Sequence, residues 1–244
     1  MKIVHLLFFS FLMMATACAQ EKTEKDTFHT PSGKTIDIYA IKHASIRIVY
    51  DGREIEVDPV SEMNPRTDYS KYPKADYILI THEHYDHCDK KAVADLEKRG
   101  TQLIANANSA RIIGKGTVMK NGDHLQLSDD IRIDAVPAYN TTPGHTQYHS
   151  KGRDNGYVLT LDGFRIYIAG DTEDINEMKE LKDIDVAFLP VNQPFTMTPQ
   201  QARQAALMIH PKVLFPYHYS ETRISEVTDL LMDSNIDVRI RNYQ

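Results

Sequence analysis

Thr81-His82-Glu83-His84-Tyr85-Asp86-His87 follows directly after a short apolar run, Tyr77–Ile80, that is typical of a buried strand. Side chains two positions apart at a strand end point to the same face, so His82 and His84 can converge on one metal ion. The last two residues of the stretch would turn back toward a second point nearby. Imidazoles together with a carboxylate suit zinc, iron or manganese better than calcium or magnesium. The cluster therefore predicts a metal site at the end of this strand.

Two further motifs follow apolar strands, Gly170-Asp171-Thr172 and Pro216-Tyr217-His218-Tyr219. Together with His82-x-His84-x-Asp86-His87, they resemble in order the metal-binding motifs of the metallo-β-lactamase fold superfamily of hydrolases. Within it, the chain is most similar to the stand-alone metal-dependent hydrolases related to the L-ascorbate-phosphate lactonases. Three segments carry that likeness: Val136-Pro-Ala-Tyr-Asn140, Gly156-Tyr-Val-Leu159 and Arg165-Ile-Tyr-Ile-Ala-Gly-Asp-Thr172. The likeness covers about residue 35 to the end and is more specific for fold and metal than for substrate.

The resemblance implies an α/β fold, a four-layer αββα sandwich in which helices cover both outer faces of two packed sheets. The periodicity by itself indicates only an α/β chain with many strands. A meander of strands is expected over residues 35–58, and a helix capped by Asp89 from Lys90 to Arg99. Thr198-Pro199 is a typical helix start. The hydrolase domain is predicted to span residues 35–244.

The resemblance also implies two divalent metal ions and their ligands. Metal one would be held by His82, His84 and a further histidine, metal two by Asp86, His87 and His218, and Asp171 would lie between them. The further histidine has two candidates. His145 lies in Pro-Gly-His-Thr, a motif of the wider superfamily, whereas His149 lies 22 residues before Asp171, as expected for the nearer branch. We favour His149 and keep His145 as the alternative.

Asp58 has two interpretations. In the family, an acidic residue at this place lies beneath the metals and orients a ligand histidine through the other ring nitrogen. A strand-end turn residue before a proline is an equally good reading. His43 lies between two predicted strands and is a further candidate for approaching the site. Cys88 follows the histidine motif directly, but the family pattern does not use it, and a small buried residue is expected there.

The predicted chemistry is hydrolysis. A water bound between two cations ionises near neutral pH and attacks an electrophilic carbonyl or phosphorus, with Asp86 as the candidate residue that orients this hydroxide. Zinc is expected from the resemblance, and manganese or iron are alternatives. The predicted substrate is a small ester, lactone or phosphodiester. A β-lactam hydrolase and a non-enzymatic metal-binding lipoprotein of the same fold are the alternative functions.

The N-terminus predicts export. Lys2 precedes a mainly apolar run to Met14 and a small-residue zone over 15–19, which is typical of a signal peptide at residues 1–19. Cleavage before Cys18 would leave a membrane-anchored lipoprotein, and cleavage after Ala19 would release a periplasmic protein; we favour the lipoprotein slightly. Residues 20–34 are predicted to be a polar tether. The net charge of −6 argues against nucleic acid as a partner, so a small-molecule substrate is expected, with the membrane reached only through a lipid anchor.

Overall fold

The computed structural model of the protein describes residues 24–243. The predicted signal peptide and Cys18 lie outside these residues, and their processing stays a prediction. Among the described residues, no helix combines the length and apolar character needed to cross a bilayer.

Two sheets of seven strands each form the centre of the molecule. The first sheet contains β1 (Lys25–His29), β2 (Thr35–Lys42), β3 (Ser45–Tyr50), β4 (Arg53–Val57), β5 (Tyr77–Ile80), β6 (Gln102–Ala105) and β7 (Thr117–Val118). The second contains β8 (His124–Ser128), β9 (Ile131–Ala138), β10 (Asp154–Leu161), β11 (Phe164–Ile168), β12 (Val186–Pro190), β13 (Val213–Tyr217) and β14 (Asp237–Val238). The helices are α1 (Lys90–Leu96), α2 (Ala107–Ile113), α3 (Pro199–Ile209) and α4 (Ser225–Leu230), with 3-10 turns at Tyr69–Lys71 and Asn176–Glu180.

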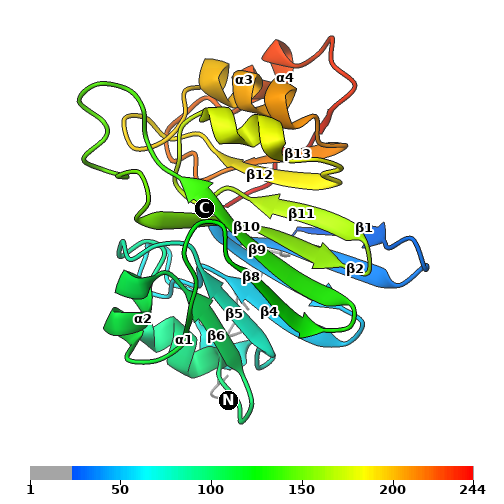
Figure 1. Cartoon of the computed structure of the whole chain (residues 1–244), viewed down its shortest axis with the longest axis vertical. Helices are drawn as coiled ribbons and strands as arrows, with labels where there is room; N and C mark the ends of the chain where they lie inside the picture. Colours follow the sequence, from blue (N-terminus) through cyan, green and yellow to red (C-terminus); the bar gives the residue numbers. More distant parts are fainter. Residues whose placement is uncertain (1–23, 244) are drawn as a thin grey trace, which may run out of the picture.

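The predicted αββα sandwich is confirmed. Alternating residues of the strands, such as Ile36 and Ile38 on β2 and Ile131 and Ile133 on β9, pack into one apolar cluster between the sheets. A second cluster lies under α3, and a third lies under α1 and α2. Figure 1 shows α1 and α2 beside the first sheet and α3 and α4 beside the second, so helices cover both outer faces.

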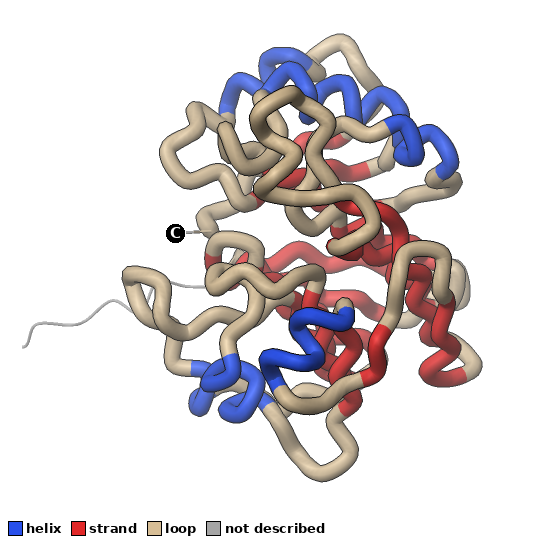
Figure 2. The backbone as a smooth tube through the Cα atoms, turned by 60° about the vertical axis from the view of Figure 1, so that its left-hand side comes forward, coloured by secondary structure: helices blue, strands red, loops and turns tan. Residues whose placement is uncertain are grey.

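The strand directions bring the functional loops together. Each sheet begins as an antiparallel meander and continues as parallel strands: β4, β5, β6 and β7 in one, and β11, β12, β13 and β14 in the other. Parallel strands place their carboxyl ends, and the loops that follow, at the same edge of a sheet, where ligands of α/β proteins commonly bind. Figure 2 shows long loops gathered at one side of the strands, between the two groups of helices.

The first described strand falls within the segment that was predicted to be a tether. β1 pairs antiparallel with β2, from Lys25 opposite Tyr39 to His29 opposite Thr35. Asp26 on β1 is buried and accepts hydrogen bonds from the guanidinium groups of Arg239 and Arg241 near the C-terminus. The folded domain therefore starts ahead of residue 35, because charge pairing and strand addition hold this polar segment on the sheet.

The predicted helix starts agree with the structure, whereas the predicted end of the helix that begins at Lys90 does not. The Asp89 side chain accepts from the backbone N–H groups of Lys91 and Ala92, which confirms it as the cap of α1. The helix ends at Leu96, three residues before the predicted Arg99, because Glu97 is already extended. Thr198 caps α3 through a reciprocal pair of hydrogen bonds with Gln201, as the Thr-Pro signal predicted.

Candidate metal centre

The ends of three strands and one long loop supply the candidate ligands. The loop after β5 carries His82, His84, Asp86 and His87. Asp171 follows β11 after a glycine, His218 directly follows β13, and His149 lies in the loop between β9 and β10. Segments far apart in the sequence therefore meet at one edge of the sandwich.

Two groups of side chains have spacings that could hold metal ions, and within each group all ligand atoms lie within 4.8 Å of one another. The first group comprises His82, His84, His149 and Asp171. The second comprises His43, Asp86, His87 and His218. The structure thus brings together the ligands that were predicted for each metal. Of the two candidates for the third histidine of metal one, His149 is in the group, and His43 joins the second group.

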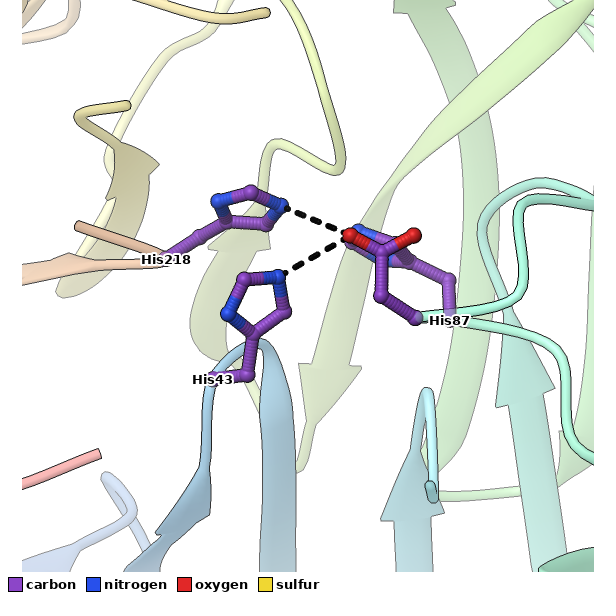
Figure 3. A group of neighbouring side chains, drawn as sticks. His43, His87 and His218 are labelled. Atoms are coloured by element: carbon purple, nitrogen blue, oxygen red, sulfur yellow. Dashed lines mark hydrogen bonds and ion pairs between the residues drawn. The ribbon is translucent and has the colours of Figure 1, made fainter. Parts of the chain in front are cut away.

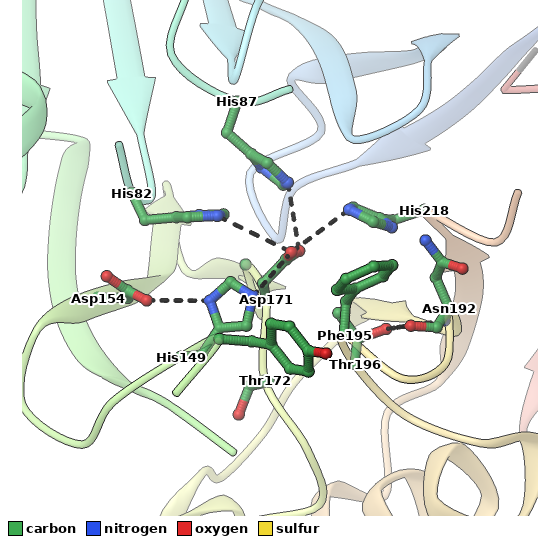
Figure 4. A network of polar contacts seen from close by, with 12 residues as sticks. His82, His87, His149, Asp154, Asp171, Thr172, Asn192, Phe195, Thr196 and His218 are labelled. Atoms are coloured by element: carbon green, nitrogen blue, oxygen red, sulfur yellow. Dashed lines mark hydrogen bonds and ion pairs between the residues drawn. The ribbon is translucent and has the colours of Figure 1, made fainter. Parts of the chain in front are cut away.

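Asp171 lies between the two groups. One carboxylate oxygen, Oδ1, is 3.3 Å from His87 Nε2. The other, Oδ2, is 3.3 Å from His149 Nε2, 3.4 Å from His218 Nε2 and 3.8 Å from His82 Nε2. Figure 4 shows these four imidazoles directed at the carboxylate from different sides. A carboxylate with two oxygens in this position can bridge two cations.

The buried polar atoms at this point fit metal ions. Within the described part of the chain, His82 Nε2, His87 Nε2, His218 Nε2 and Asp171 Oδ1 are buried and have no hydrogen-bond partner. An unsatisfied buried polar atom costs about 1–3 kcal/mol, and these four are aimed at one another. Metal coordination would satisfy all of them, and nitrogen and oxygen donors accept zinc, manganese or iron.

The charges of the ligands are coupled. Burial raises the pKa of Asp171, but the neighbouring His218 and His87 outweigh it and hold that pKa well below the usual value. Burial lowers the pKa of His218, yet the Asp171 carboxylate raises it further, to about 9. Without metal, protons on imidazoles thus balance the buried carboxylate, so binding of cations should release protons.

Asp58 has the contacts that orientation of ligand histidines requires. It is fully buried, and its Oδ2 lies 2.9 Å from His87 Nδ1. The same oxygen accepts from Thr81 Oγ1 at 2.7 Å, and this hydroxyl oxygen lies 3.0 Å from His82 Nδ1. Because the carboxylate only accepts, Nδ1 of His87 donates, which leaves its Nε2 lone pair free for a metal. Asp58 also directly follows β4 and has a positive φ of 44°, so both interpretations of this residue describe real features.

Asp154 makes the equivalent contact for the other group and was not identified from the sequence. Its buried Oδ2 lies 3.0 Å from His149 Nδ1. Arg153 donates to both carboxylate oxygens, through Nε at 2.7 Å and Nη2 at 2.8 Å. In the sequence, Asp154 is simply an acidic residue five positions after a candidate histidine. Its contact with His149 forms only because the loop before β10 folds back on itself, which the sequence does not show.

Asp154→Asn is expected to weaken metal binding about 10–100-fold at the group that contains His149, because the amide is a poorer acceptor for the Nδ1 proton. Titration of the metal-free protein with zinc, read by calorimetry, measures this affinity. Asp134→Asn makes the same change in a surface pair with Arg132 and serves as the control. Unchanged zinc affinity in Asp154→Asn would contradict the orienting role.

His43 was only a weak candidate in the sequence. It occupies the turn between β2 and β3, and its Nε2 lies 3.1 Å from Asp86 Oδ2. Its ring centroid is 3.7 Å from that of His218. Figure 3 shows His43 and His218 both directed at one carboxylate oxygen, Oδ2 of Asp86. The second group therefore has one more imidazole than was predicted.

The alternative histidine and the cysteine lie outside both groups. His145 is partly exposed, and its Nδ1 lies 3.4 Å from Glu173 Oε1 instead of near Asp171. Cys88 is buried in the apolar cluster under α1, and burial raises the pKa of its thiol to about 11. The expectation of a small buried residue at Cys88 is confirmed.

Gly170 sets the position of Asp171. Its φ is +63°, and a Cβ there would lie 2.9 Å from the Asn155 carbonyl oxygen and 3.0 Å from Thr81 Cβ. Gly170→Ala should therefore push the bridging carboxylate out of place and lower the bound metal per chain. Gly122→Ala is the matched control, because Gly122 has a φ of +91° but nothing within 4 Å. Equal metal content in the two variants would contradict this explanation.

Comparison with known proteins agrees with the site. A family model described as "Beta-lactamase superfamily domain" matches residues 37–218. A UPF0173 metal-dependent hydrolase of Thermococcus onnurineus is 32% identical over 195 residues, which cover 76% of this chain and 85% of that protein. Another, of Ligilactobacillus salivarius, is 32% identical over 189 residues, covering 73% of this chain and 82% of that one.

Solved structures extend the likeness to three dimensions. The crystal structure of a protein from Parabacteroides distasonis, described as a metal-dependent hydrolase, is similar with a TM-score of 0.89 and 59% identity, covering 91% of this chain and all of that one. The metallo hydrolase Igni18 of Ignicoccus hospitalis shares the fold, with a TM-score of 0.71 and 24% identity, over 85% of this chain and 95% of that one. The chain therefore belongs to the UPF0173 metal-dependent hydrolases of the metallo-β-lactamase superfamily.

Proposed function

We propose that this metal-dependent hydrolase cleaves a small ester, lactone or phosphodiester. The observation that carries the proposal is the Asp171 carboxylate, which lies between imidazoles of both groups; Nε2 of His82, His87 and His218 is buried there without a hydrogen-bond partner. Two divalent cations held there would supply an ionised water near neutral pH and would stabilise the charge that develops on the substrate oxygen. Sequence motifs that resemble those of the L-ascorbate-phosphate lactonases favour a lactone among the candidate substrates.

The residues divide the work between binding and orientation. His82, His84 and His149 would hold one cation, and His43, Asp86, His87 and His218 the other, with Asp171 shared. Asp86 is only partly buried, unlike Asp171, and its Oδ2 contacts His43 and His218. A carboxylate held on one side and open on the other can orient a water toward a substrate. We assign Asp86 this catalytic role.

Aromatic side chains near the metal ligands support a small organic substrate. Tyr85, between two ligand residues, is 81% exposed, and Phe195 is 43% exposed. The Phe195 ring packs edge-on against Tyr148, with centroids 5.0 Å apart. Figure 4 shows Phe195 close to the ligand histidines. Aromatic rings at such a position can contact an organic substrate through their apolar faces.

The test is hydrolysis by protein loaded with zinc or manganese, assayed with 4-nitrophenyl acetate, γ-butyrolactone and bis(4-nitrophenyl) phosphate. Metal-dependent turnover of at least one probe is expected, together with its loss in Asp86→Ala. Turnover that persists after removal of the metals, or that Asp86→Ala leaves unchanged, would contradict the proposed mechanism. Hydrolysis of a β-lactam such as nitrocefin with none of the three probes would favour the alternative substrate class.

We also propose that the protein is exported and anchored through a lipid on Cys18, on the strength of the N-terminal sequence alone. Expression in a bacterium with radiolabelled palmitate should label the wild-type chain but not Cys18→Ala. Release of an unlabelled wild-type protein into the periplasm would instead favour cleavage after Ala19. Retention in the cytoplasm would contradict export.

A further inference from the structure

Lys42 is a buried cation for which the described structure contains no anionic partner. It is the last residue of β2, immediately before His43, and its side chain is 3% exposed. Its Nζ donates to the backbone oxygen of Met63 at 2.7 Å. No described carboxylate lies within 4.0 Å of it, and Glu62, next to Met63, pairs with Arg66 instead.

Such an arrangement is costly unless something else completes it. An ammonium group carries three N–H donors, and the Met63 carbonyl uses one of them. Removing a charge from water is unfavourable, and a neutral carbonyl offsets this penalty only in part. Two donors and the positive charge therefore remain for a partner that residues 24–243 do not provide.

The space for that partner lies beside the metal centre. A cavity of about 190 Å³ is lined by Lys42, His43, Met63, Asn64, Tyr219, Ser220, Glu221 and Tyr243. His43 belongs to both the cavity wall and the second metal group. At about 30 Å³ per water molecule, the cavity holds a group of roughly six waters in volume, enough for a carboxylate or phosphate but too small for a large substrate.

The other lining groups tolerate one negative charge. The Tyr219 hydroxyl already donates to the Arg241 backbone oxygen at 2.9 Å, and Asn64 offers an uncharged amide. Glu221 is exposed, and among the described residues it is the only carboxylate that lines the cavity. It would repel highly charged ligands more than singly charged ones, so the cavity suits one compact anionic group.

We propose that Lys42 and this cavity bind an anionic oxygen group of the substrate, a carboxylate or phosphate, next to the bond that is cleaved. The inference rests on the proposed function and narrows its substrate class to anionic esters, lactones and phosphodiesters. Lys42 would fix the charged end of the substrate while the metal ligands on the far side of His43 serve the reacting end. Its role is in binding and specificity, so it should act on KM more than on kcat.

Binding of inorganic phosphate to the metal-loaded protein, measured by calorimetry, tests the site directly. Lys42→Gln removes the charge but keeps an N–H donor for Met63, and should raise the Kd for phosphate at least tenfold. Lys120→Gln makes the same change on an exposed lysine and should leave the Kd unchanged. Phosphate that contacted only the metals would bind Lys42→Gln as tightly as wild type, and that result would overturn the proposal. So would failure of the wild-type protein to bind millimolar phosphate.

A second variant separates binding from structural support. Lys42→Met replaces the buried ammonium by an apolar chain and should keep or raise the unfolding temperature while it weakens phosphate binding. A lysine that merely ties Met63 in place would instead give a destabilised variant with unchanged phosphate affinity, against the proposal. In kinetics, Lys42→Gln should raise KM at least tenfold for mono(4-nitrophenyl) succinate, whose free carboxylate is separate from the reacting ester, and leave KM for neutral 4-nitrophenyl acetate unaltered.

The two proposals fail in different ways. Lys42-dependent phosphate binding by a protein that hydrolyses none of the probes would leave the anion site standing and count against the proposed reaction. Metal-dependent hydrolysis by a protein whose phosphate affinity does not depend on Lys42 would support the proposed reaction and contradict the anion site.

Discussion

Asp171→Asn is expected to lose at least one metal ion per chain and nearly all hydrolytic activity. Its two oxygens lie within 3.3–3.8 Å of four imidazole nitrogens drawn from both groups, and an amide offers one weaker oxygen and no charge. Electrostatic stabilisation by a metal ion is worth several kcal/mol, so the loss should reach about 10³-fold in kcat. Elemental mass spectrometry and the probe assays measure the two effects.

Asp183→Asn is a suitable control, because Asp183 is an exposed acidic residue with a positive φ that asparagine also tolerates. It should retain both metals and full activity. Two metals per chain in Asp171→Asn would show that the carboxylate does not bridge them.

The second large effect distinguishes the two candidate histidines. His149→Ala should lose the metal of the first group and reduce hydrolysis about 10³-fold, because its Nε2 lies 3.3 Å from the shared carboxylate and its Nδ1 is held by Asp154. His145→Ala should retain both metals, since its nearest acidic partner is Glu173. Metal content and circular dichroism of the two variants, measured side by side, separate loss of metal from loss of fold.

The reverse order, with His145→Ala losing metal and His149→Ala keeping it, would overturn the ligand assignment. Loss of metal in both variants would show that the loop between β9 and β10 acts as one unit. In that case deletion would not distinguish the two histidines, and the assignment of His149 alone as the ligand would be contradicted.

The fold and the main ligand groups could be predicted from the sequence because the ligand residues directly follow segments whose local pattern predicts a strand. A buried run before the histidine motif predicted the strand end that β5 provides, and Asp89 and Thr198 marked helix starts by their side-chain chemistry. Ordered motifs supplied the partners that lie 84 residues or more downstream of His87. Physical chemistry alone gives no rule that predicts a contact between residues so far apart in the sequence.

The features that the sequence did not predict, or in the case of His43 marked only as a weak candidate, depend on contacts between distant segments. His43 joins the second group only because the turn after β2 lies beside the residue after β13, where the His218 N–H donates to the His43 carbonyl at 3.0 Å. Asp154 faces His149 only after the intervening loop closes, and β1 is held by Arg239 and Arg241 from the opposite end of the chain. Each of these features has an ordinary local sequence and acquires its role from tertiary structure.

Metal content per chain tests the central claim most directly. The wild-type protein, purified, reconstituted with zinc or manganese and freed of excess ions, should contain two equivalents by elemental mass spectrometry, one for each group of ligands. Two equivalents that fall in Asp171→Asn and persist in Asp183→Asn are the predicted result. A wild-type chain that takes up no metal after reconstitution would contradict the account, because the buried imidazoles and the carboxylate between them would then need another explanation.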